Sequence, residues 1–200
     1  MKIIFRIFSA CLLGSCLLIS FAKADTSIII VRHGEKAALG LGQLTCRGLN
    51  RSLALAPLLL TRYGKPVAVF APNPAIKKLD KGVLYDYVRP LATIEPLAIR
   101  AGLPVNVDFG MEDTAHLVQI LLAQTEGTQI VAWEHHLGER LAKELLAAAG
   151  SDPTVVPTWD DADFDSIYIV KISGSGKDQH AIFGHENQGL NNLSDQCGDK

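Results

Sequence analysis

The chain has 200 residues, of which 48 % are hydrophobic and 20 % are charged, and its formal net charge is -2. This composition is that of one ordinary globular domain. It excludes an intrinsically disordered chain, which would have less apolar content and more net charge. It also argues against a nucleic-acid-binding protein, which usually has a basic excess. The sequence therefore predicts a folded domain that does not bind nucleic acid.

The first 24 residues differ in character from the rest. Lys2 and Arg6 give a positive beginning, residues 7–22 are uncharged, and the run Ala-Lys-Ala at 22–24 has the small residues that a signal peptidase recognises. The uncharged stretch of 16 residues is shorter than the roughly 20 apolar residues of a membrane-spanning helix. We therefore expect a cleaved signal peptide over 1–24 and a single domain over 25–200. The mature protein would be secreted or periplasmic, without a stable membrane anchor.

The cysteines bear on the same question. Cys16 follows Leu-Gly-Ser, so lipidation of this cysteine is an alternative to cleavage before Asp25. Cleavage would remove three basic residues and leave a net charge of -5. Cys46 and Cys197 would then lie in a compartment that permits disulfides, and they could form one bridge.

The first predicted elements of the domain form a crossover unit. Ile28–Val31 is a β-branched run that predicts a central parallel strand buried on both faces. A helix should follow Thr45, with Arg47 and Arg51 on its exposed face, and a second strand should cover Pro66–Phe70. Strand, helix and strand in this order are typical of α/β folds. The helix positions expected to face the sheet are Leu49, Leu53, Ala56 and Leu60.

The alternation of strands and helices continues to the end of the chain. Residues 71–87 lack periodicity and predict a surface loop with one helical turn. Helices are expected over 90–101, from Asp113 to near Gly127, and over 140–149, and strands over 105–109, 129–133, 166–172 and 181–184. The helix after Asp113 should turn Leu117, Ile120 and Leu121 inward. The sequence thus predicts a three-layer α/β/α sandwich with a mostly parallel central sheet.

Polar residues gather where the strands of this sheet end, which is the edge at which open parallel sheets bind ligands. A neutral imidazole is a competent nucleophile near neutral pH, and an arginine can form two hydrogen bonds to phosphate oxygens. A glycine beside them allows close backbone approach. These residue types predict phosphoryl transfer. The residues concerned are Arg32, His33, Gly34 and Glu35 after the first strand, Arg89 at a helix start, and Glu134, His135 and His136 after the fourth strand.

At these positions the sequence resembles the histidine phosphatase superfamily, also called the phosphoglycerate mutase-like group. Val31–Glu35 resembles its Arg-His-Gly signature, and Leu44–Arg51 resembles the Leu-Thr-x-x-Gly stretch that follows. Arg89–Ala98 is similar to its Arg-x-x-x-Thr-Ala helix, and Ile130–His135 to the strand that delivers its second histidine. The matches occur in the family's order and span most of residues 25–149. The resemblance implies a phosphoglycerate mutase-like fold and a phosphatase activity.

The resemblance also implies the role of each residue. His33 would be the nucleophile that becomes phosphohistidine, while Arg32, Arg89 and His135 would bind the phosphate. These groups can donate hydrogen bonds to the negatively charged oxygens of a transferring phosphoryl group. Water would then attack the phosphoenzyme, and no metal or other cofactor would be required. The substrate would be a small-molecule phosphate ester or another phosphorylated molecule.

A carboxylic acid should protonate the leaving oxygen. In the family this acid commonly lies in the loop after the strand that follows the arginine-containing helix, which implies Glu112 or its neighbour Asp113. Glu35 and Glu134 are alternatives because each adjoins a pocket residue. We take Glu112 as the expected proton donor.

Other functions are compatible with the same residues. A non-catalytic phosphate-binding or interaction protein would keep the fold but lack an effective acid. A metal-dependent hydrolase could use His33, His135 and His136 with a carboxylate, although adjacent histidines on an extended segment should point to opposite sides. A phosphomutase is a further alternative, but its sugar-phosphate substrates are cytosolic and the leader directs this chain outward.

Overall fold

The computed structural model describes residues 25–197, so the predicted signal peptide lies outside the described residues. A six-stranded sheet runs through the described chain. Its strands are β1 (Thr26–Arg32), β4 (Ala68–Phe70), β7 (Val105–Asn106), β8 (Gly127–Trp133), β9 (Ser166–Ser173) and β10 (His180–Asn187). Their order is β10-β9-β1-β8-β4-β7. β1, β8, β4 and β7 pair in parallel, whereas β9 and β10 add antiparallel at one edge.

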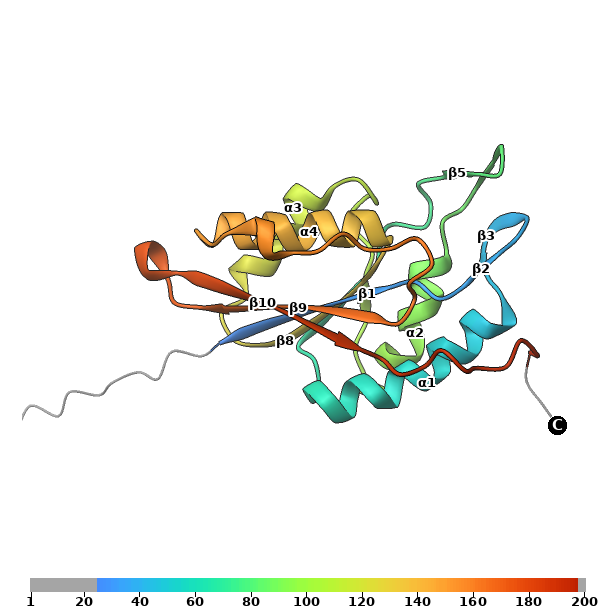
Figure 1. Cartoon of the computed structure of the whole chain (residues 1–200), viewed down its shortest axis with the longest axis horizontal. Coiled ribbons are helices and arrows are strands. Elements are labelled where there is room, and N and C mark those ends of the chain that lie inside the picture. Colours follow the sequence, from blue (N-terminus) through green and yellow to red (C-terminus); the bar gives the residue numbers. More distant parts are fainter. Residues whose placement is uncertain (1–24, 198–200) are drawn as a thin grey trace, which may run out of the picture.

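Helices cover both faces of this sheet. They are α1 (Cys46–Tyr63), α2 (Arg89–Ala101), α3 (Thr114–Ala123) and α4 (His135–Ala148), with short 3₁₀ turns η1 (Pro153–Val155) and η2 (Gly176–Asp178). In Figure 1, α3 and α4 lie on one side of the sheet and α1 and α2 on the other. The predicted three-layer α/β/α sandwich with a mostly parallel central sheet is therefore confirmed.

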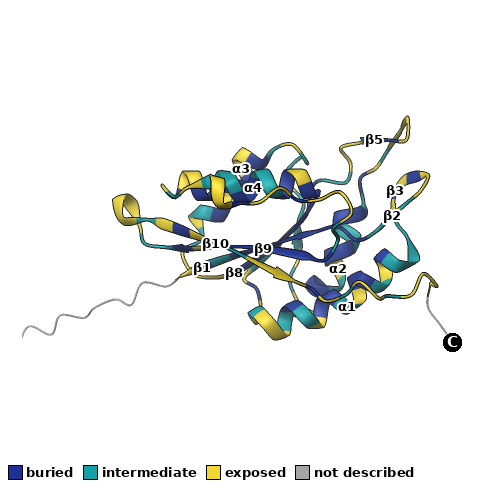
Figure 2. Ribbon diagram, viewed as in Figure 1, coloured by how far each residue is buried: buried dark blue, intermediate teal, exposed yellow. Residues whose placement is uncertain are grey.

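The β-branched run in β1 belongs to both layers of the core. Ile28 and Ile30 pack with residues of α3 and α4, while Ile29 and Val31 pack with residues of α1 and α2. Alternate residues of a strand point to opposite faces, so a strand covered on both faces must be apolar throughout. Figure 2 shows β1 and β9 buried along most of their length, whereas the edge strand β10 is largely exposed.

The sheet-facing side of α1 is only partly the one that the sequence predicted, since Ala56 is buried as expected. Thr45 and Gly64 cap the helix as expected, but Leu49 and Leu53 are exposed. One cause is Gly48, where a Cβ atom would lie 2.6 Å from the Glu35 carbonyl oxygen, so this position packs tightly against the loop after β1. The buried positions are Gly48, Arg51, Ser52, Leu55, Ala56 and Leu59.

Arg51 was also predicted on the exposed face, and that prediction was wrong. The side chain is buried because its partners are distant in sequence: its Nη2 lies 2.8 Å from Glu35 Oε1 and its Nη1 3.4 Å from Asp165 Oδ1. Its Nη1 also donates to Gln188 Oε1 at 2.8 Å. A buried charge is tolerated when it is paired and hydrogen-bonded.

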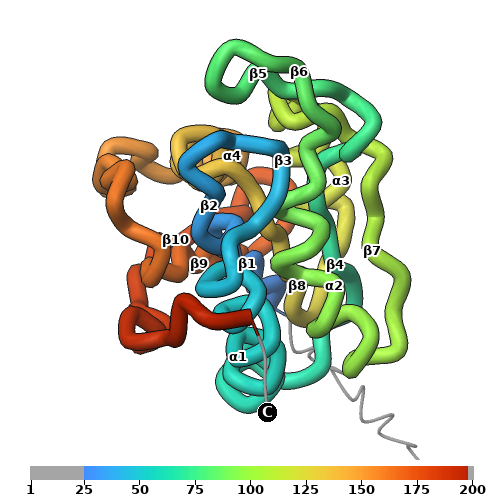
Figure 3. The backbone as a smooth tube through the Cα atoms, turned by 90° about the vertical axis from the view of Figure 1, so that its right-hand side faces the viewer, coloured from blue at the N-terminus to red at the C-terminus, as the bar shows by residue number. Residues whose placement is uncertain are grey.

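Two hairpins stand at the carboxyl edge of the sheet. The first is β2 (Lys36–Ala37) with β3 (Gly40–Leu44), and the second is β5 (Lys78–Asp80) with β6 (Val83–Tyr85). The second replaces the helical turn that we predicted within 71–87. Lys81 and Gly82, between its strands, have φ of 52° and 84°, and two positive φ values in succession favour a tight hairpin turn. Figure 3 shows the hairpins side by side.

Helix α4 begins at His135, five residues before the predicted start. Glu134 caps it by accepting a hydrogen bond from the Leu137 N–H at 3.1 Å. Glutamate is not a favoured N-cap residue, so the sequence did not indicate this boundary. On α3, Leu117 and Leu121 are buried as predicted, but Ile120 is exposed.

A disulfide joins Cys46 to Cys197, with their Cα atoms 4.5 Å apart. The C-terminal segment lies along the start of α1, where Asn50 Nδ2 donates to the backbone oxygens of Ser194 and Gln196. The bridge that the sequence allowed is thus present. Among residues 25–197, no helix combines the length and apolarity needed to cross a membrane.

Candidate active site

The loop after β1 is fixed from two sides at the carboxyl edge of the sheet. The His33 N–H donates to the Trp133 carbonyl at 3.0 Å, which ties the ends of β1 and β8 together. The Gly34 N–H donates to Thr93 Oγ1 at 2.9 Å, and that hydroxyl donates to the Arg89 carbonyl at 2.8 Å. Arg89 and Thr93 are one helical turn apart on α2, so this chain of bonds positions Arg89 relative to His33.

The glycines of the signature have a steric role. A Cβ atom on Gly34 would lie 2.8 Å from the Gly48 carbonyl oxygen and 2.9 Å from the Gly48 Cα atom. Both contacts are shorter than side-chain packing allows. The close approach that we predicted for Gly34 is therefore made to the backbone of α1, which explains why a second glycine follows Thr45 after two residues.

The His33 ring is 2 % exposed, and its Nδ1 lies 2.7 Å from the Gly34 carbonyl oxygen. A carbonyl can only accept, so Nδ1 carries the proton and Nε2 keeps its lone pair. The pKa of His33 falls to about 3, chiefly because of burial; the bond to Gly34 opposes this shift, and the nearby Arg89 and Arg32 add to it. The ring is neutral at ordinary pH, which a nucleophile requires.

Each of the two predicted arginines lies over an aromatic ring beside His33. The Arg32 guanidinium is 3.8 Å from the centroid of Phe164, and that ring is 6.3 Å from the His33 ring. The Arg89 guanidinium is 5.0 Å from the centroid of Tyr87, and that ring is 6.0 Å from the His33 ring. Each ring therefore lies between one arginine contact and the neighbourhood of the imidazole.

Arg32 and Arg89 each use some of their N–H groups in contacts within the protein and leave the buried Nε–H without a partner among the described residues. Arg32 Nη1 donates to the carbonyls of Asp161 and Asp163 at 2.8 Å, and Arg89 Nη1 lies 2.5 Å from Asp80 Oδ2. The Nε atoms of both arginines are buried and have no hydrogen-bond partner among the described residues. Unpartnered buried donors are costly, and an anion with several oxygens would satisfy them.

His135 lies between two carboxylates. Its Nε2 is 2.6 Å from Asp161 Oδ1. Its Nδ1 is 2.6 Å from Glu134 Oε1, but the alignment does not meet hydrogen-bond geometry. Although burial acts to raise it, the pKa of Glu134 falls to about 2 because of the adjacent His135 ring and the Leu137 N–H. Glu134 is therefore ionised, and its charge also reaches His33 and Arg32.

The four carboxylates considered as proton donors have different surroundings. Glu35 forms a two-point contact with Arg51 and belongs to the scaffold. Glu112 is 70 % exposed at its side chain and lies 3.4 Å from Arg140, so the structure does not bring it to His33. Its neighbour Met111 borders the pocket, because its sulfur contacts Lys78 Nζ at 3.6 Å. Asp113 precedes α3 and contacts His116 at 2.8 Å.

Several residues of this region were not predicted from the sequence. They are Lys78, Asp80, Tyr87, Asp161 and Phe164. All come from segments without periodicity, and no local pattern marks them. Only the tertiary fold brings residues 78–87 and 161–164 to the two sides of His33.

The predicted geometry of the adjacent histidines was wrong. His135 and His136 lie in the first turn of α4 rather than on an extended segment, and their ring centroids are 4.0 Å apart. Ligand atoms of Glu134, His135 and His136 fall within 4.8 Å of one another. His33 does not belong to this group, so the described residues do not form the metal centre of the alternative hydrolase.

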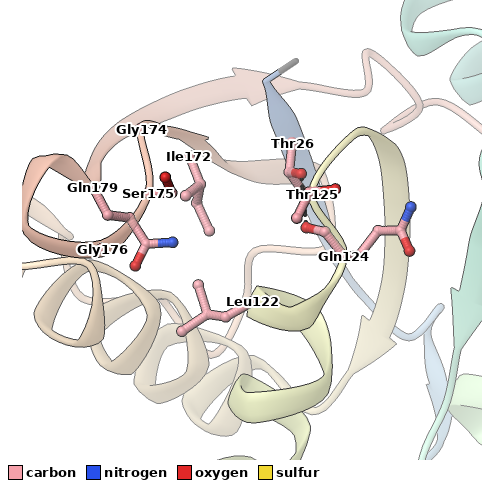
Figure 4. Close-up of a pocket in the computed structure, with 9 residues that line it drawn as sticks. All are labelled: Thr26, Leu122, Gln124, Thr125, Ile172, Gly174, Ser175, Gly176 and Gln179. Atoms are coloured by element: carbon pink, nitrogen blue, oxygen red, sulfur yellow. Dashed lines mark hydrogen bonds between the residues drawn. The ribbon is translucent and has the colours of Figure 1, made fainter. Parts of the chain in front are cut away.

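A separate hollow of about 340 Å³ lies at the other end of the sheet (Figure 4). Thr26, the first residue of β1, lines it, whereas His33 follows the last residue of β1. Its lining contains no histidine or charged side chain. It therefore does not offer the chemistry of the His33 region, which we take as the candidate active site.

The low pKa of His33 has a consequence for stability. Because the folded-state pKa is about 3, against an ordinary value of 6.5, the unfolded chain binds a proton that the folded chain does not. Unfolding free energy should therefore fall as pH falls below 6.5, by up to about 1.4 kcal/mol per pH unit. Urea unfolding between pH 6.5 and 5.5 measures this slope, above the ordinary pKa of 4.5 near which Glu134 takes up a proton in the unfolded chain.

The matched variant is His33→Asn, which has no ring to titrate. Its unfolding free energy should depend less on pH over the same range. Equal slopes for the two proteins would show that His33 is not held neutral by the fold.

No family model and no curated protein matches this sequence. Solved structures do match it over most of its length. The candidate phosphohistidine phosphatase SixA from Nakamurella multipartitia has a TM-score of 0.51 at 13 % identity, covering 81 % of this chain and 96 % of that one. A phosphoserine phosphatase from Entamoeba histolytica, solved with phosphoserine, has a TM-score of 0.49 at 13 % identity, covering 83 % and 98 %. A phosphoglycerate mutase from Bacillus anthracis has a TM-score of 0.49 at 11 % identity, covering 82 % and 93 %.

These structural neighbours are members of the histidine phosphatase superfamily. The similarity to the Nakamurella protein shows a shared fold. At this level of identity, the likeness concerns the fold, and the chemistry of this chain has to be argued from its own residues.

Proposed function

We propose that this protein is a phosphatase that hydrolyses phosphate monoesters through a phosphohistidine on His33. The observation that carries the proposal is the His33 ring: it is buried and neutral, its Nδ1 is used by Gly34, its Nε2 is left as a nucleophile, and the charges of Arg89 and Arg32 reach it. The substrate is a small phosphorylated molecule or a phosphorylated protein, in keeping with what the neighbouring phosphatases are named for.

The reaction follows from the charges at the site. His33 Nε2 attacks phosphorus, the bond from phosphorus to the ester oxygen breaks, and that oxygen takes a proton from an acid. Arg32, Arg89 and His135 donate hydrogen bonds to the oxygens of the transferring group, whose negative charge they balance. Water then gives a proton to the carboxylate that acted as the acid and attacks phosphorus, the bond to Nε2 breaks, and phosphate leaves.

The direct test is hydrolysis of p-nitrophenyl phosphate by the purified protein after treatment with a chelator. We expect activity well above that of His33→Ala, because no step uses a metal. Absence of hydrolysis above that background would overturn the proposal. Activity lost on chelation and recovered with zinc would instead support a metal-dependent hydrolase.

We propose Glu112 as the proton donor and Glu134 as a residue that positions His135. Glu134 is held ionised, which does not suit an acid that must give a proton, whereas Glu112 would have to leave Arg140 to reach the substrate. Glu112→Gln should slow esters with poor leaving groups much more than esters with good ones, since a good leaving group needs no proton.

Glu134→Gln is the matched comparison for this prediction. It should slow both kinds of ester by a similar factor, because it disturbs a phosphate ligand rather than the acid. Steady-state kinetics over a series of aryl and alkyl phosphates distinguishes the two. Equal slowing of all esters by Glu112→Gln would count against its role.

One observation favours a second candidate function. Glu134, whose charge reaches His33, is held ionised, and Glu112 pairs with Arg140 rather than lying at His33. A protein of this kind could bind a phosphorylated ligand without cleaving it. Tight binding of inorganic phosphate by a protein that hydrolyses none of the esters would support this function.

We also propose that residues 1–24 direct export and that the mature protein begins at Asp25. The disulfide between Cys46 and Cys197 supports an oxidising compartment. N-terminal sequencing of the exported protein checks the cleavage site, and a lipidated Cys16 would contradict it.

A further inference from the structure

The start of α4 holds a cluster of metal-binding groups beside the phosphate pocket. His135 and His136 are consecutive in the first turn, and their Nε2 atoms lie 2.6 Å and 3.1 Å from the same oxygen, Oδ1 of Asp161. The two rings are tilted by 35° with centroids 4.0 Å apart. Two imidazole nitrogens therefore lie within 3.1 Å of one carboxylate oxygen.

This donor set has the chemistry of a transition-metal site. Two histidines and one carboxylate bind Zn²⁺ and leave a fourth position for water or another ligand. Glu134 does not belong to this donor set but supports it, because its Oε1 lies 2.6 Å from Nδ1, the other ring nitrogen of His135. A carboxylate on the second nitrogen of a ligating histidine orients the ring and strengthens it as a ligand.

The cluster is open to solvent on the side where an ion would enter. The side chains of His136 and Asp161 are 59 % and 83 % exposed, whereas those of His135 and Glu134 are 9 % and 10 % exposed. An ion can thus reach the Nε2 atoms without unfolding of α4. It would replace the hydrogen bond between His135 Nε2 and Asp161.

We propose that His135, His136 and Asp161 form an inhibitory site for Zn²⁺ or a similar divalent transition metal. The proposed metal binding depends only on the geometry of this cluster. The inhibition rests on the proposed function, in which His135 donates from its ring to the phosphate. A metal on Nε2 of His135 removes that donor and occupies the side of the pocket beside Glu134. Metal and phosphate ester would then compete for the same histidine.

The first test measures metal binding without reference to activity. Calorimetry with Zn²⁺ and visible absorption with Co²⁺ should show one bound ion per chain of the purified protein. His136→Ala should weaken the affinity by at least about tenfold. The matched control is His116→Ala, because His116 is also exposed, pairs with an aspartate at 2.8 Å and lies outside the cluster; its affinity should equal that of the wild type.

Asp161→Asn is a second variant, which keeps both histidines and should also weaken binding. Failure of the wild type to bind one ion, or equal affinity in wild type and His136→Ala, would overturn the site. Either result would leave the proposed phosphatase function standing.

The second test measures the effect on hydrolysis of p-nitrophenyl phosphate. Added Zn²⁺ should inhibit the chelator-treated wild type at concentrations that match the calorimetric affinity, and excess substrate should relieve the inhibition. His136→Ala should resist the same concentrations. Binding without inhibition would overturn the inhibitory role, and stimulation by Zn²⁺ would contradict both this role and the metal-independent reaction.

Discussion

Replacing His33 with alanine should lower kcat for p-nitrophenyl phosphate by about 10³-fold or more, because it removes the atom that attacks phosphorus. The two arginines and His135 remain in this variant, so phosphate should still bind. Steady-state kinetics measures the first effect and calorimetry with inorganic phosphate the second. Loss of hydrolysis with retained binding is the expected combination.

The His33 site is buried, so a folding defect must be separated from a chemical one. His33→Gln keeps a polar side chain of similar reach and serves as the second variant, with circular dichroism and thermal unfolding recorded for both. His180→Ala removes an exposed histidine far along the chain and should change nothing. Hydrolysis within tenfold of wild type by a folded His33→Ala would show that another residue does the chemistry.

Replacing Arg89 with methionine should lower kcat/KM by about 10²-fold to 10³-fold, since a donor aimed at developing charge contributes in this range. Thr93 bonds to the backbone carbonyl of residue 89, which this variant keeps, so the loop that carries His33 should stay in place. The same assay with p-nitrophenyl phosphate measures the effect.

Arg89→Met also leaves Asp80 without its cation in a buried place, which destabilises the fold. The double variant Arg89→Met with Asp80→Asn removes that penalty and should recover thermal stability without recovering activity. Arg62→Met, which affects an exposed arginine 3.7 Å from Glu186, is the matched control and should be as active as wild type. Recovery of activity in the double variant would show that Arg89 serves the fold rather than the phosphate.

The architecture was predictable because it follows from local patterns. The run Ile28–Val31 can only be a strand covered on both faces, and the caps at Thr45 and Gly64 bound a helix between two such strands. Arg51 was placed wrongly because its burial depends on Glu35 and on residues more than one hundred positions away. Periodicity within a helix does not reveal partners of that kind.

The clustering of the candidate residues was predictable where topology determines it. Arg32, His33 and His135 follow parallel strands that end side by side, and Arg89 begins the helix that packs beside them. The start of α4 was missed because a glutamate caps it, and that one boundary changed the relation between His135 and His136 from opposite sides to one shared oxygen. Tyr87 and Phe164 lie in irregular segments, so only the three-dimensional structure shows that their rings lie near His33.

The central claim is that His33 carries the phosphoryl group during turnover. A rapid acid-free quench of the protein with a ³²P-labelled aryl phosphate, followed by peptide mapping, tests it directly. We predict one label that is stable to base, labile to acid and located on His33, with none in His33→Ala. Turnover with no such label, or a label on any other residue, would contradict the account.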